Sequence, residues 1–220
     1  NGIYRPLTVF SFALNYIYFG DAPDSFHAVN IILHGIVCFI VYLLIRALFG
    51  DQLLALYTAV IFLCFPVLTE AVASIKSRDE LLSGLFVLLS WLAFLKAIGK
   101  QKINYAFIGM SACLFFLGLL SKEFRIAAPA LFIGIYWIQK RSSFREIVTL
   151  SCIFSIPVLT YAWMRYQAVG SYALVPNPSW FVINPLVFTS FAVKVLTAFK
   201  IYYLYIQKTL VPYNLSATYA

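Results

Sequence analysis

Long apolar runs separated by short polar turns extend along most of this chain. A helix needs roughly 20 mostly apolar residues to cross the hydrocarbon of a bilayer. The strongest candidates are His27–Phe49, Leu53–Thr69, Glu80–Ile98, Ile103–Leu120 and Glu146–Gln167. Together with two weaker segments, Ile126–Ile138 and Pro185–Pro212, they predict an all-α, polytopic transmembrane bundle of about seven membrane helices.

The beginning and the end of the chain depart from this regular pattern. Thr8–Phe19 is apolar and aromatic but too short to span, so we predict a surface or re-entrant helix within an outer-face region at residues 1–26. Residues 27–212 then form the membrane helices with short loops, all within one domain of residues 1–220. Lys194, Lys200 and Lys208 predict that the last segment lies partly along the membrane interface, with its lysines snorkelling.

Composition excludes a soluble domain. Hydrophobic residues make up 63% of the chain and charged residues 11%, about half the charged share of an ordinary soluble domain. Lys and Arg outnumber Asp and Glu by 16 to 8, but they are scattered between apolar runs and do not form the patch that a nucleic-acid surface requires. The four cysteines lie inside apolar runs without metal-type spacing, so we predict neither a disulfide nor a metal site.

The acidic residues indicate a topology. If the turn at Gly50 faces the cytoplasm, six of the eight carboxylates fall on the opposite, outer side of the membrane. The cations are divided almost evenly between the two sides, so the positive-inside preference supports the same assignment only weakly. The outer side therefore carries most of the groups that could act as bases.

Two short polar motifs fall on this outer side, each next to an apolar segment. Arg5 precedes Pro6, a residue that suits the first turn of a helix. At the membrane surface its planar guanidinium can hold a phosphate. Lys122 and Glu123 form a tight polar turn between two apolar stretches. Taken alone, each motif also fits an ordinary anchor at the membrane surface.

The densest polar stretch runs from Thr69 to Glu80. Ser77 and Glu80 have the spacing of a capping box and predict the start of a helix. Glu70 and Arg78 receive no structural role from this motif. A carboxylate and a guanidinium at the membrane boundary can orient an acceptor hydroxyl and a lipid phosphate, respectively. An ordinary charged turn is the alternative interpretation.

Polar residues also interrupt the first full span. His27, Asn30 and His34 share one helical face because they are three and four residues apart. Polar groups within a span usually face the bundle interior or a cavity, so we predict that Asn30 and His34 point into the bundle. They act either as interhelical hydrogen-bonding groups or, for Asn30 together with Asp24, His27 and Asp79, as the lining of a cavity.

Several motifs, in this order and at this spacing, resemble the transmembrane and tetratricopeptide-repeat family of O-mannosyltransferases and its prokaryotic relatives. The motifs are Tyr4–Thr8, Leu14–Tyr16, Phe26–His34, Pro66 with Thr69–Val72, Arg78 with Leu81–Leu82, Ser121–Glu123, and Pro212 with Leu215–Ser216 and Tyr219. The chain departs from the family pattern after Pro66, where a histidine is usual, and at Phe124-Arg125, where many members have a glutamine or glutamate and a glycine. Both departures bear on the class of acceptor.

The resemblance implies a polytopic class C glycosyltransferase. Such an enzyme takes a sugar, here mannose, from a dolichyl or polyprenyl phosphate carrier and transfers it to a protein Ser or Thr hydroxyl on the lumenal or periplasmic face. The resemblance implies no tightly bound cofactor and leaves a divalent-metal requirement open. The family's first span and acidic first outer loop precede the motif at Tyr4–Thr8, so it also implies a fragment that lacks both and is inactive alone.

The resemblance and the shared outer position together give a set of site residues. We expect Glu70 and Glu123 to be catalytic, and Arg5, Arg78 and Lys122 to bind the donor phosphate. We expect one outward-facing cavity, open sideways to lipid, to be lined by Arg5, Glu70, Arg78 and Glu123. The expected partners are the bilayer, the lipid-linked donor and a protein acceptor, in the endoplasmic reticulum membrane of a eukaryote or the inner membrane of a bacterium.

Two other functions are compatible with the same sequence. A membrane transporter or lipid flippase would use His27, Asn30 and His34 to line a path through the bundle. A noncatalytic scaffold in a membrane complex would need none of these residues. A span and an acidic outer loop immediately before Asn1 would favour the transferase over both.

Overall fold

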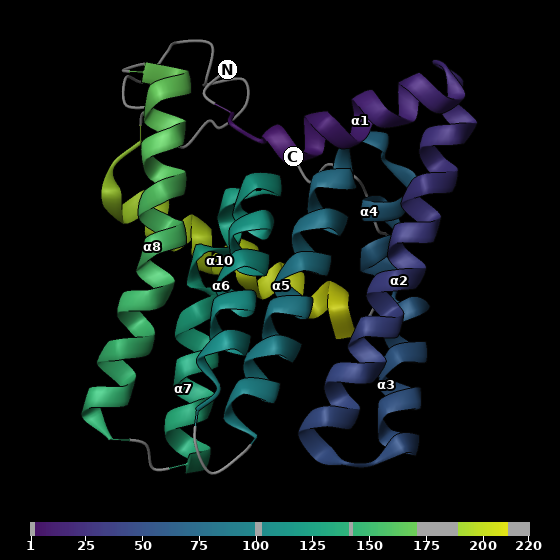
Figure 1. Ribbon diagram of the computed structural model, residues 1–220. Coiled ribbons are helices and arrows are strands. Elements are labelled where there is room, and N and C mark those ends of the chain that lie inside the picture. The colour runs from purple at the N-terminus through teal and green to yellow at the C-terminus, as the bar shows by residue number, and fades with distance from the viewer. Residues whose placement is uncertain (1–2, 100–102, 141–142, 171–188, 211–220) are drawn as a thin grey trace.

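The structure is a computed structural model that describes residues 3–99, 103–140, 143–170 and 189–210. In these ranges every regular element is helical (Figure 1). The longer helices are α1 (Pro6–Phe19), α2 (Pro23–Phe49), α3 (Gln52–Leu63), α5 (Arg78–Ile98), α6 (Tyr105–Ser121), α7 (Ala128–Lys140), α8 (Phe144–Val169) and α10 (Phe191–Leu210). Short elements connect some of them: η1 (Pro66–Leu68), α4 (Thr69–Ala73), η2 (Ile75–Ser77) and η3 (Glu123–Ala127). The predicted all-α, polytopic fold class is confirmed.

Three of the described helical stretches are long and apolar enough to cross a membrane, namely Pro23–Phe49, Ile75–Ile98 and Phe144–Val169. Helices α1, α3 and α6 are apolar but shorter. Helix α7 begins two residues later than predicted, after the 3-10 turn η3. The predicted segment Pro185–Pro212 begins and ends outside the described residues, and its described part forms α10.

The prediction of one span at Leu53–Thr69 is wrong, because α3 ends at Leu63. A proline pushes the residue before it out of the helical conformation. Phe65, which precedes Pro66, is accordingly extended, with φ −73° and ψ 115°. The chain then turns through η1 into the short helix α4, which carries Glu70.

Local sequence explains where several helices begin and end. Pro6 and Pro23 occupy the first turns of α1 and α2. Gly50 ends α2 with φ +74°, a left-handed conformation that glycine adopts without steric cost. Asp51 then caps α3 by accepting hydrogen bonds from the backbone nitrogens of Leu53 and Leu54. Gly50 and Asp51 together make the sharp connection between α2 and α3.

The capping box predicted at Ser77 is wrong. The Ser77 side chain makes no capping hydrogen bond at the start of α5, and the Glu80 side chain instead accepts a hydrogen bond from Lys122. A capping box does occur at the start of α8, where Ser143 and Glu146 bond reciprocally. Glu80 therefore bonds to the neighbouring Lys122 cation and does not make the capping bond that its spacing from Ser77 favours.

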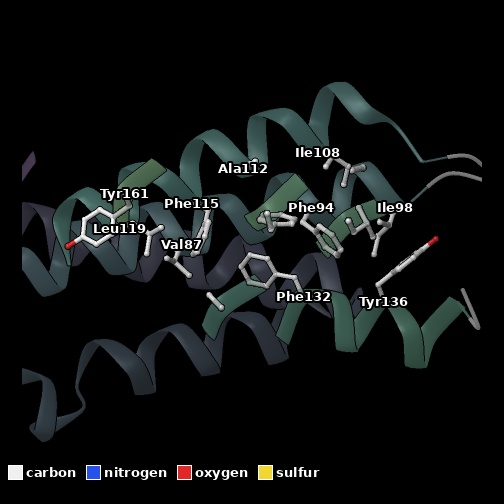
Figure 2. Close-up of a cluster of buried hydrophobic side chains, with 14 residues drawn as sticks. Val87, Phe94, Ile98, Ile108, Ala112, Phe115, Leu119, Phe132, Tyr136 and Tyr161 are labelled. Atoms are coloured by element: carbon white, nitrogen blue, oxygen red, sulfur yellow. The ribbon is translucent and has the colours of Figure 1, made fainter. Parts of the chain in front are cut away.

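Aromatic side chains pack the core between α5, α6, α7 and α8 (Figure 2). The Phe94 ring lies 5.8 Å from the Phe132 ring and 6.1 Å from the Phe154 ring, measured between centroids. Helices α5 and α6 approach closely at Gly118, where an added Cβ would lie 3.0 Å from Val87. This core fixes the relative positions of the α5 start and the α6 end.

The helices alternate in direction, so their ends form two groups (Figure 1). Helices α2, α5 and α7 end, and α3, α6 and α8 begin, at the end of the bundle that contains the Gly50 turn. Helix α1 lies across the opposite end, near α4, the start of α5 and the end of α6. The predicted grouping of the loops is confirmed. Which end faces the cytoplasm stays a prediction.

Candidate functional site

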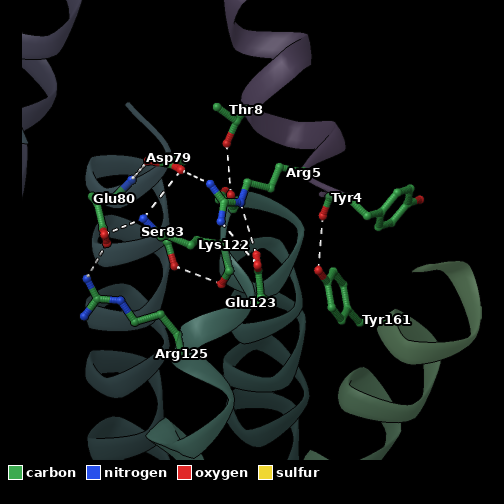
Figure 3. A network of polar contacts seen from close by, with 11 residues as sticks. Tyr4, Arg5, Thr8, Asp79, Glu80, Ser83, Lys122, Glu123, Arg125 and Tyr161 are labelled. Carbon is green, nitrogen blue, oxygen red and sulfur yellow. Dashed lines mark hydrogen bonds and ion pairs between the residues drawn. The ribbon is translucent and has the colours of Figure 1, made fainter. Parts of the chain in front are cut away.

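Four charged side chains from three separate segments meet where α1 crosses the end of the bundle (Figure 3). They are Arg5, Asp79, Lys122 and Glu123, and we call them the charge cluster. Arg5 is the N-cap residue of α1, Asp79 lies in the first turn of α5, and the other two follow the last residue of α6. The chain therefore assembles the cluster from the ends of three helices.

The guanidinium of Arg5 is held from two sides. Its Nε and Nη2 donate to the two carboxylate oxygens of Glu123, at 3.1 and 3.2 Å. Its Nη1 donates to Oδ2 of Asp79. This paired geometry is the one by which arginine binds carboxylates and phosphates with two parallel hydrogen bonds. Arg5 thus presents to Glu123 the same edge that a phosphate would use.

Lys122 completes the charge cluster. Its Nζ lies 3.6 Å from Oδ2 of Asp79 and 2.5 Å from Oε1 of Glu80. Arg125 contacts the other oxygen of Glu80 at 3.5 Å. The Asp79 carboxylate is therefore shared by the cations of Arg5 and Lys122, and Glu80 with Arg125 forms the more exposed rim of the cluster.

Burial makes these interactions strong compared with surface ion pairs. The side chains of Asp79, Lys122 and Arg5 are 6, 14 and 15% exposed. Burial alone would lower the pKa of Arg5, but the hydrogen bond and charge of Glu123 raise it overall. Burial likewise opposes ionisation of Glu123, yet the hydrogen bond from Arg5 lowers the pKa of this carboxyl. The pairing of Arg5 with Glu123 therefore favours the charged form of both side chains.

Neutral side chains hold α1 at the charge cluster. Thr8 is buried and donates to the backbone carbonyl of Ser121, at 3.1 Å, just before Lys122. The Tyr161 hydroxyl on α8 donates to the carbonyl of Tyr4, also at 3.1 Å (Figure 3). Both bonds flank Arg5 in the sequence. The start of α1 is thereby tied to both α6 and α8.

Arg78 is next to Asp79 but belongs to a different part of the structure. Its side chain is fully buried and donates to the side-chain oxygens of Asn30 and Asn15, at 3.0 and 2.8 Å. It also donates to the carbonyls of Ser11 and Phe26, at 3.3 and 3.1 Å. Arg78 thus connects α5 to α1 and α2, and its guanidinium nitrogens already bond to protein.

The polar face of α2 points inward, as predicted. Asn30 is fully buried and His34 is 8% exposed. Besides accepting from Arg78, Asn30 donates to the carbonyl of Ser74 at 3.2 Å. The His34 ring lies 3.5 Å from the carbonyl oxygen of Leu63 and stacks on Phe62. These two residues therefore make interhelical contacts, one of the two roles the sequence left open.

The other predicted site residues lie at the same end of the bundle without joining the charge cluster. Glu70 is exposed on α4, Asp24 is exposed in the first turn of α2, and His27 is half-buried one turn later. Among the residues that the structure describes, no group of three or more His, Cys, Asp or Glu side chains is arranged to hold a metal ion.

Sequence reasoning missed several residues that support the site. Asn15 and Thr8 are polar positions inside an aromatic, apolar helix, and both are buried. That contrast was a usable signal, because a buried polar group needs a partner. Tyr161 and Glu80 gave no comparable signal, since a tyrosine in a membrane helix and a glutamate at a helix start are both common.

Comparisons with known proteins find relatives of one kind. Residues 6–166 match the family model described as dolichyl-phosphate-mannose-protein mannosyltransferase. Protein O-mannosyl-transferase tmtc2 of Xenopus laevis is 43% identical over 42% of this chain and 11% of its own length. Protein O-mannosyl-transferase TMTC3 of Mus musculus is 36% identical over 54% of this chain and 13% of its own length. Protein O-mannosyl-transferase F38B6.6 of Caenorhabditis elegans is 30% identical over 81% of this chain and 25% of its own length.

These relatives are much longer than this chain, which spans 11 to 25% of their length. No solved structure matches the chain. The family match begins one residue after Arg5 and contains the rest of the charge cluster. The candidate site therefore falls within, or directly next to, the part of the chain that the relatives share.

Proposed function

The chain belongs to the dolichyl-phosphate-mannose-protein mannosyltransferase family, and from this we propose that it forms part of the membrane core of a protein O-mannosyltransferase. The full enzyme would take mannose from a dolichyl or polyprenyl phosphate and attach it to a Ser or Thr hydroxyl of a protein. The reaction would occur on the lumenal face of the endoplasmic reticulum membrane or, in a bacterium, on the periplasmic face of the inner membrane. The names of the relatives support the sugar and the acceptor class.

The observation that carries this proposal is the pair of cations, Arg5 and Lys122, at one end of an apolar bundle. A lipid-linked donor keeps its isoprenoid tail in the hydrocarbon and its phosphate at the surface. Partly buried cations at that level would bind the phosphate and stabilise the charge that develops as it leaves. Asn30 and His34 make interhelical contacts with Arg78, Ser74 and Leu63, which is the role predicted from the sequence as the alternative to lining a path.

The transfer itself is a displacement at the sugar carbon. The acceptor oxygen forms a bond to C1 of mannose, and the bond from C1 to the phosphate oxygen breaks with inversion. The acceptor proton passes to a carboxylate base, and the electron pair of the broken bond leaves with dolichyl phosphate. Glu70 is exposed on α4 and is our candidate for the carboxylate that meets the acceptor.

Arg5 and Glu123 suggest how donor binding prepares the site. Because Glu123 occupies the paired edge of Arg5, an incoming phosphate competes with it for the same two nitrogens. A phosphate that binds there releases the carboxylate, whose pKa then rises because it loses the hydrogen bond that lowers it. We propose that Glu123 becomes a stronger base only after the donor has bound, which makes it a second candidate, beside Glu70, for the carboxylate that takes the acceptor proton.

A transfer assay on the full-length protein in membranes tests the proposal. Labelled mannose is supplied on dolichyl phosphate together with a Ser- and Thr-containing acceptor protein. Arg5→Gln should lower transfer by roughly 10²-fold, the scale of one lost transition-state charge stabiliser. Arg46→Gln, at the opposite end of α2, is the matched control and should leave transfer unchanged. Equal activity of the two variants would contradict the proposal, as would flipping of the lipid-linked sugar without transfer.

A further inference from the structure

Arg78 and its partners form a buried joint between three helices. Its guanidinium lies 4.5 Å from the centroid of the Phe12 ring and 5.5 Å from that of Phe26. It donates four hydrogen bonds, two to groups of α1 and two to groups of α2. An arginine has five N–H donors in a fixed planar arrangement, and these four hydrogen bonds use nearly all of them. No shorter or more flexible cation would reach the same acceptors.

The four acceptors are two amide side chains and two backbone carbonyls, all of them uncharged. A buried cation is costly unless its hydrogen bonds are satisfied. Moving α1 away from α2 would leave the guanidinium of Arg78 without half of its acceptors. The buried charge therefore favours one docked position of α1 strongly over displaced ones.

The position of α1 matters because Arg5 begins this helix. The Arg5 carbonyl accepts the first backbone bond of α1, from Val9 at 3.1 Å. Ser11 and Asn15, which Arg78 holds, lie further along the same continuous helix. A helix transmits its placement over such short lengths, so Arg78 contributes, together with the hydrogen bonds of Thr8 and Tyr161, to where the Arg5 guanidinium meets Asp79 and Glu123.

The same joint reaches the segment that carries Glu70. Asn30 accepts from Arg78 and donates to the carbonyl of Ser74. The backbone nitrogen of Ser74 in turn donates to the carbonyl of Glu70 at 3.0 Å. Arg78 is thus linked to the acceptor-side Glu70 through Asn30 and Ser74, and to the donor-side Arg5 through helix α1.

From these contacts we infer that Arg78 is a positioning residue: it locks α1 and α4 against α2 and so sets the geometry between the donor and acceptor sides of the site, without touching the phosphate. This inference replaces the direct phosphate contact that the sequence led us to expect for Arg78. Its functional part rests on the proposed transferase activity, whereas its structural part does not.

Spin-label distances test the structural part without any substrate. Labels are placed at Val9, exposed on α1, and Tyr105, exposed at the start of α6, in the full-length protein with its native cysteines replaced. A second pair at Leu53 and Tyr105, both at the other end of the bundle, reports whether the bundle remains intact. The measurement is the width of each distance distribution in lipid nanodiscs.

In Arg78→Gln the Val9–Tyr105 distribution should become broad while the Leu53–Tyr105 distribution stays narrow. Asn15→Ala removes a single acceptor on α1 and should broaden the first distribution by a smaller amount. If Arg78→Gln also broadens the Leu53–Tyr105 distribution, the whole bundle is disturbed in that variant. Asn15→Ala is then the variant that tests the inference. A Val9–Tyr105 distribution as narrow in Asn15→Ala as in the wild type would overturn the inference.

Transfer kinetics test the functional part. Arg78→Gln should lower kcat/KM by roughly 10²-fold in the wild-type background and by clearly less when Arg5→Gln is already present, because the part of its effect that passes through Arg5 is then already lost. Independent, multiplicative losses would overturn the assignment of Arg78 as a residue that acts through Arg5. An inactive wild-type protein would contradict the proposed function and leave the distance result standing.

Discussion

Arg78 and Asp79 are neighbours in the first turn of α5, yet their side chains serve different parts of the protein. Arg78 bonds to α1 and α2 in a fully buried site, whereas Asp79 contacts the cations of Arg5 and Lys122. Two consecutive residues therefore connect the helical framework to the charge cluster. Small movements of α5 at this point would alter both at once.

Asp79→Asn should destabilise the protein, because it removes the negative charge shared by Arg5 and Lys122. Breaking a buried ion pair by removing one partner costs about 3–5 kcal/mol, and we expect somewhat less here since the cations keep other carboxylate partners. Thermal unfolding of the purified protein in detergent measures the change. Asp24→Asn, at an exposed position, is the control, and equal melting temperatures for the two variants would disprove a supporting role for Asp79.

The Arg5–Glu123 pair gives a defined pH dependence. The pKa of Glu123 is lower in the folded protein than in the unfolded chain, where a glutamate has a pKa of about 4.3. The pair therefore contributes its full stability above about pH 4.3, and this contribution is lost as the pH falls through the folded pKa. The difference in melting temperature between the wild type and Glu123→Gln should be constant from about pH 7 to 5.5 and shrink below about pH 4.3. A difference that shrinks already between pH 7 and 5.5 would contradict the lowered pKa.

Gly118→Ala should destabilise the contact between α5 and α6, because the new Cβ would lie 3.0 Å from Val87. Extra carbon in a well-packed interface typically costs about 1–3 kcal/mol. Gly109→Ala on the same helix meets nothing within 4 Å and should be neutral or stabilise by up to about 1 kcal/mol. Unfolding midpoints of the two variants, compared under one condition, test the difference in sign.

Ser90 and Ser111 form a reciprocal pair between the same two helices. Each hydroxyl donates to the backbone carbonyl of the other residue, at 2.8 and 2.7 Å, and both serines are fully buried. Each single change to alanine should cost about 1 kcal/mol. The double variant should lose less than the sum of the two, because the hydroxyls also contact each other at 3.0 Å. Strictly additive losses in a double-mutant cycle would show that the two hydroxyls act independently.

Accessibility labelling tests which end of the bundle faces outward. Cysteines at Ala73, on α4, and at Gln52, at the start of α3, are both at exposed positions. If the acidic end is the lumenal or periplasmic face, an impermeant reagent in vesicles that present this face outward should label Ala73→Cys. Gln52→Cys should be labelled only after the membrane is opened. The reverse pattern would invert the predicted topology.

The length of the apolar runs predicted most helices of this fold, because a helix that crosses a bilayer needs about 20 mostly apolar residues. It failed where a single residue ends a helix. Phe65 is extended because Pro66 follows it, and α3 ends before its apolar run does. The sequence pattern placed four charged residues at one membrane boundary, namely Arg5, Asp79, Lys122 and Glu123. It could not show which of these side chains form ion pairs with one another. It also could not show that Arg78 is buried, since its acceptors Asn15 and Asn30 lie 63 and 48 residues away in the sequence.

Helices α1 and α5 both begin at the charge cluster, and this shared direction adds positive potential at the phosphate site that we propose there. The peptide dipoles of a helix sum to a partial positive charge at its N-terminus, where an anion gains about 0.3–1 kcal/mol. Arg5 is the N-cap residue of α1 and Asp79 lies in the first turn of α5, so the backbone itself contributes positive potential there. If phosphate binds there as proposed, a variant that lacks the Arg5 charge should keep a residual affinity for phosphate, because the backbone contribution remains.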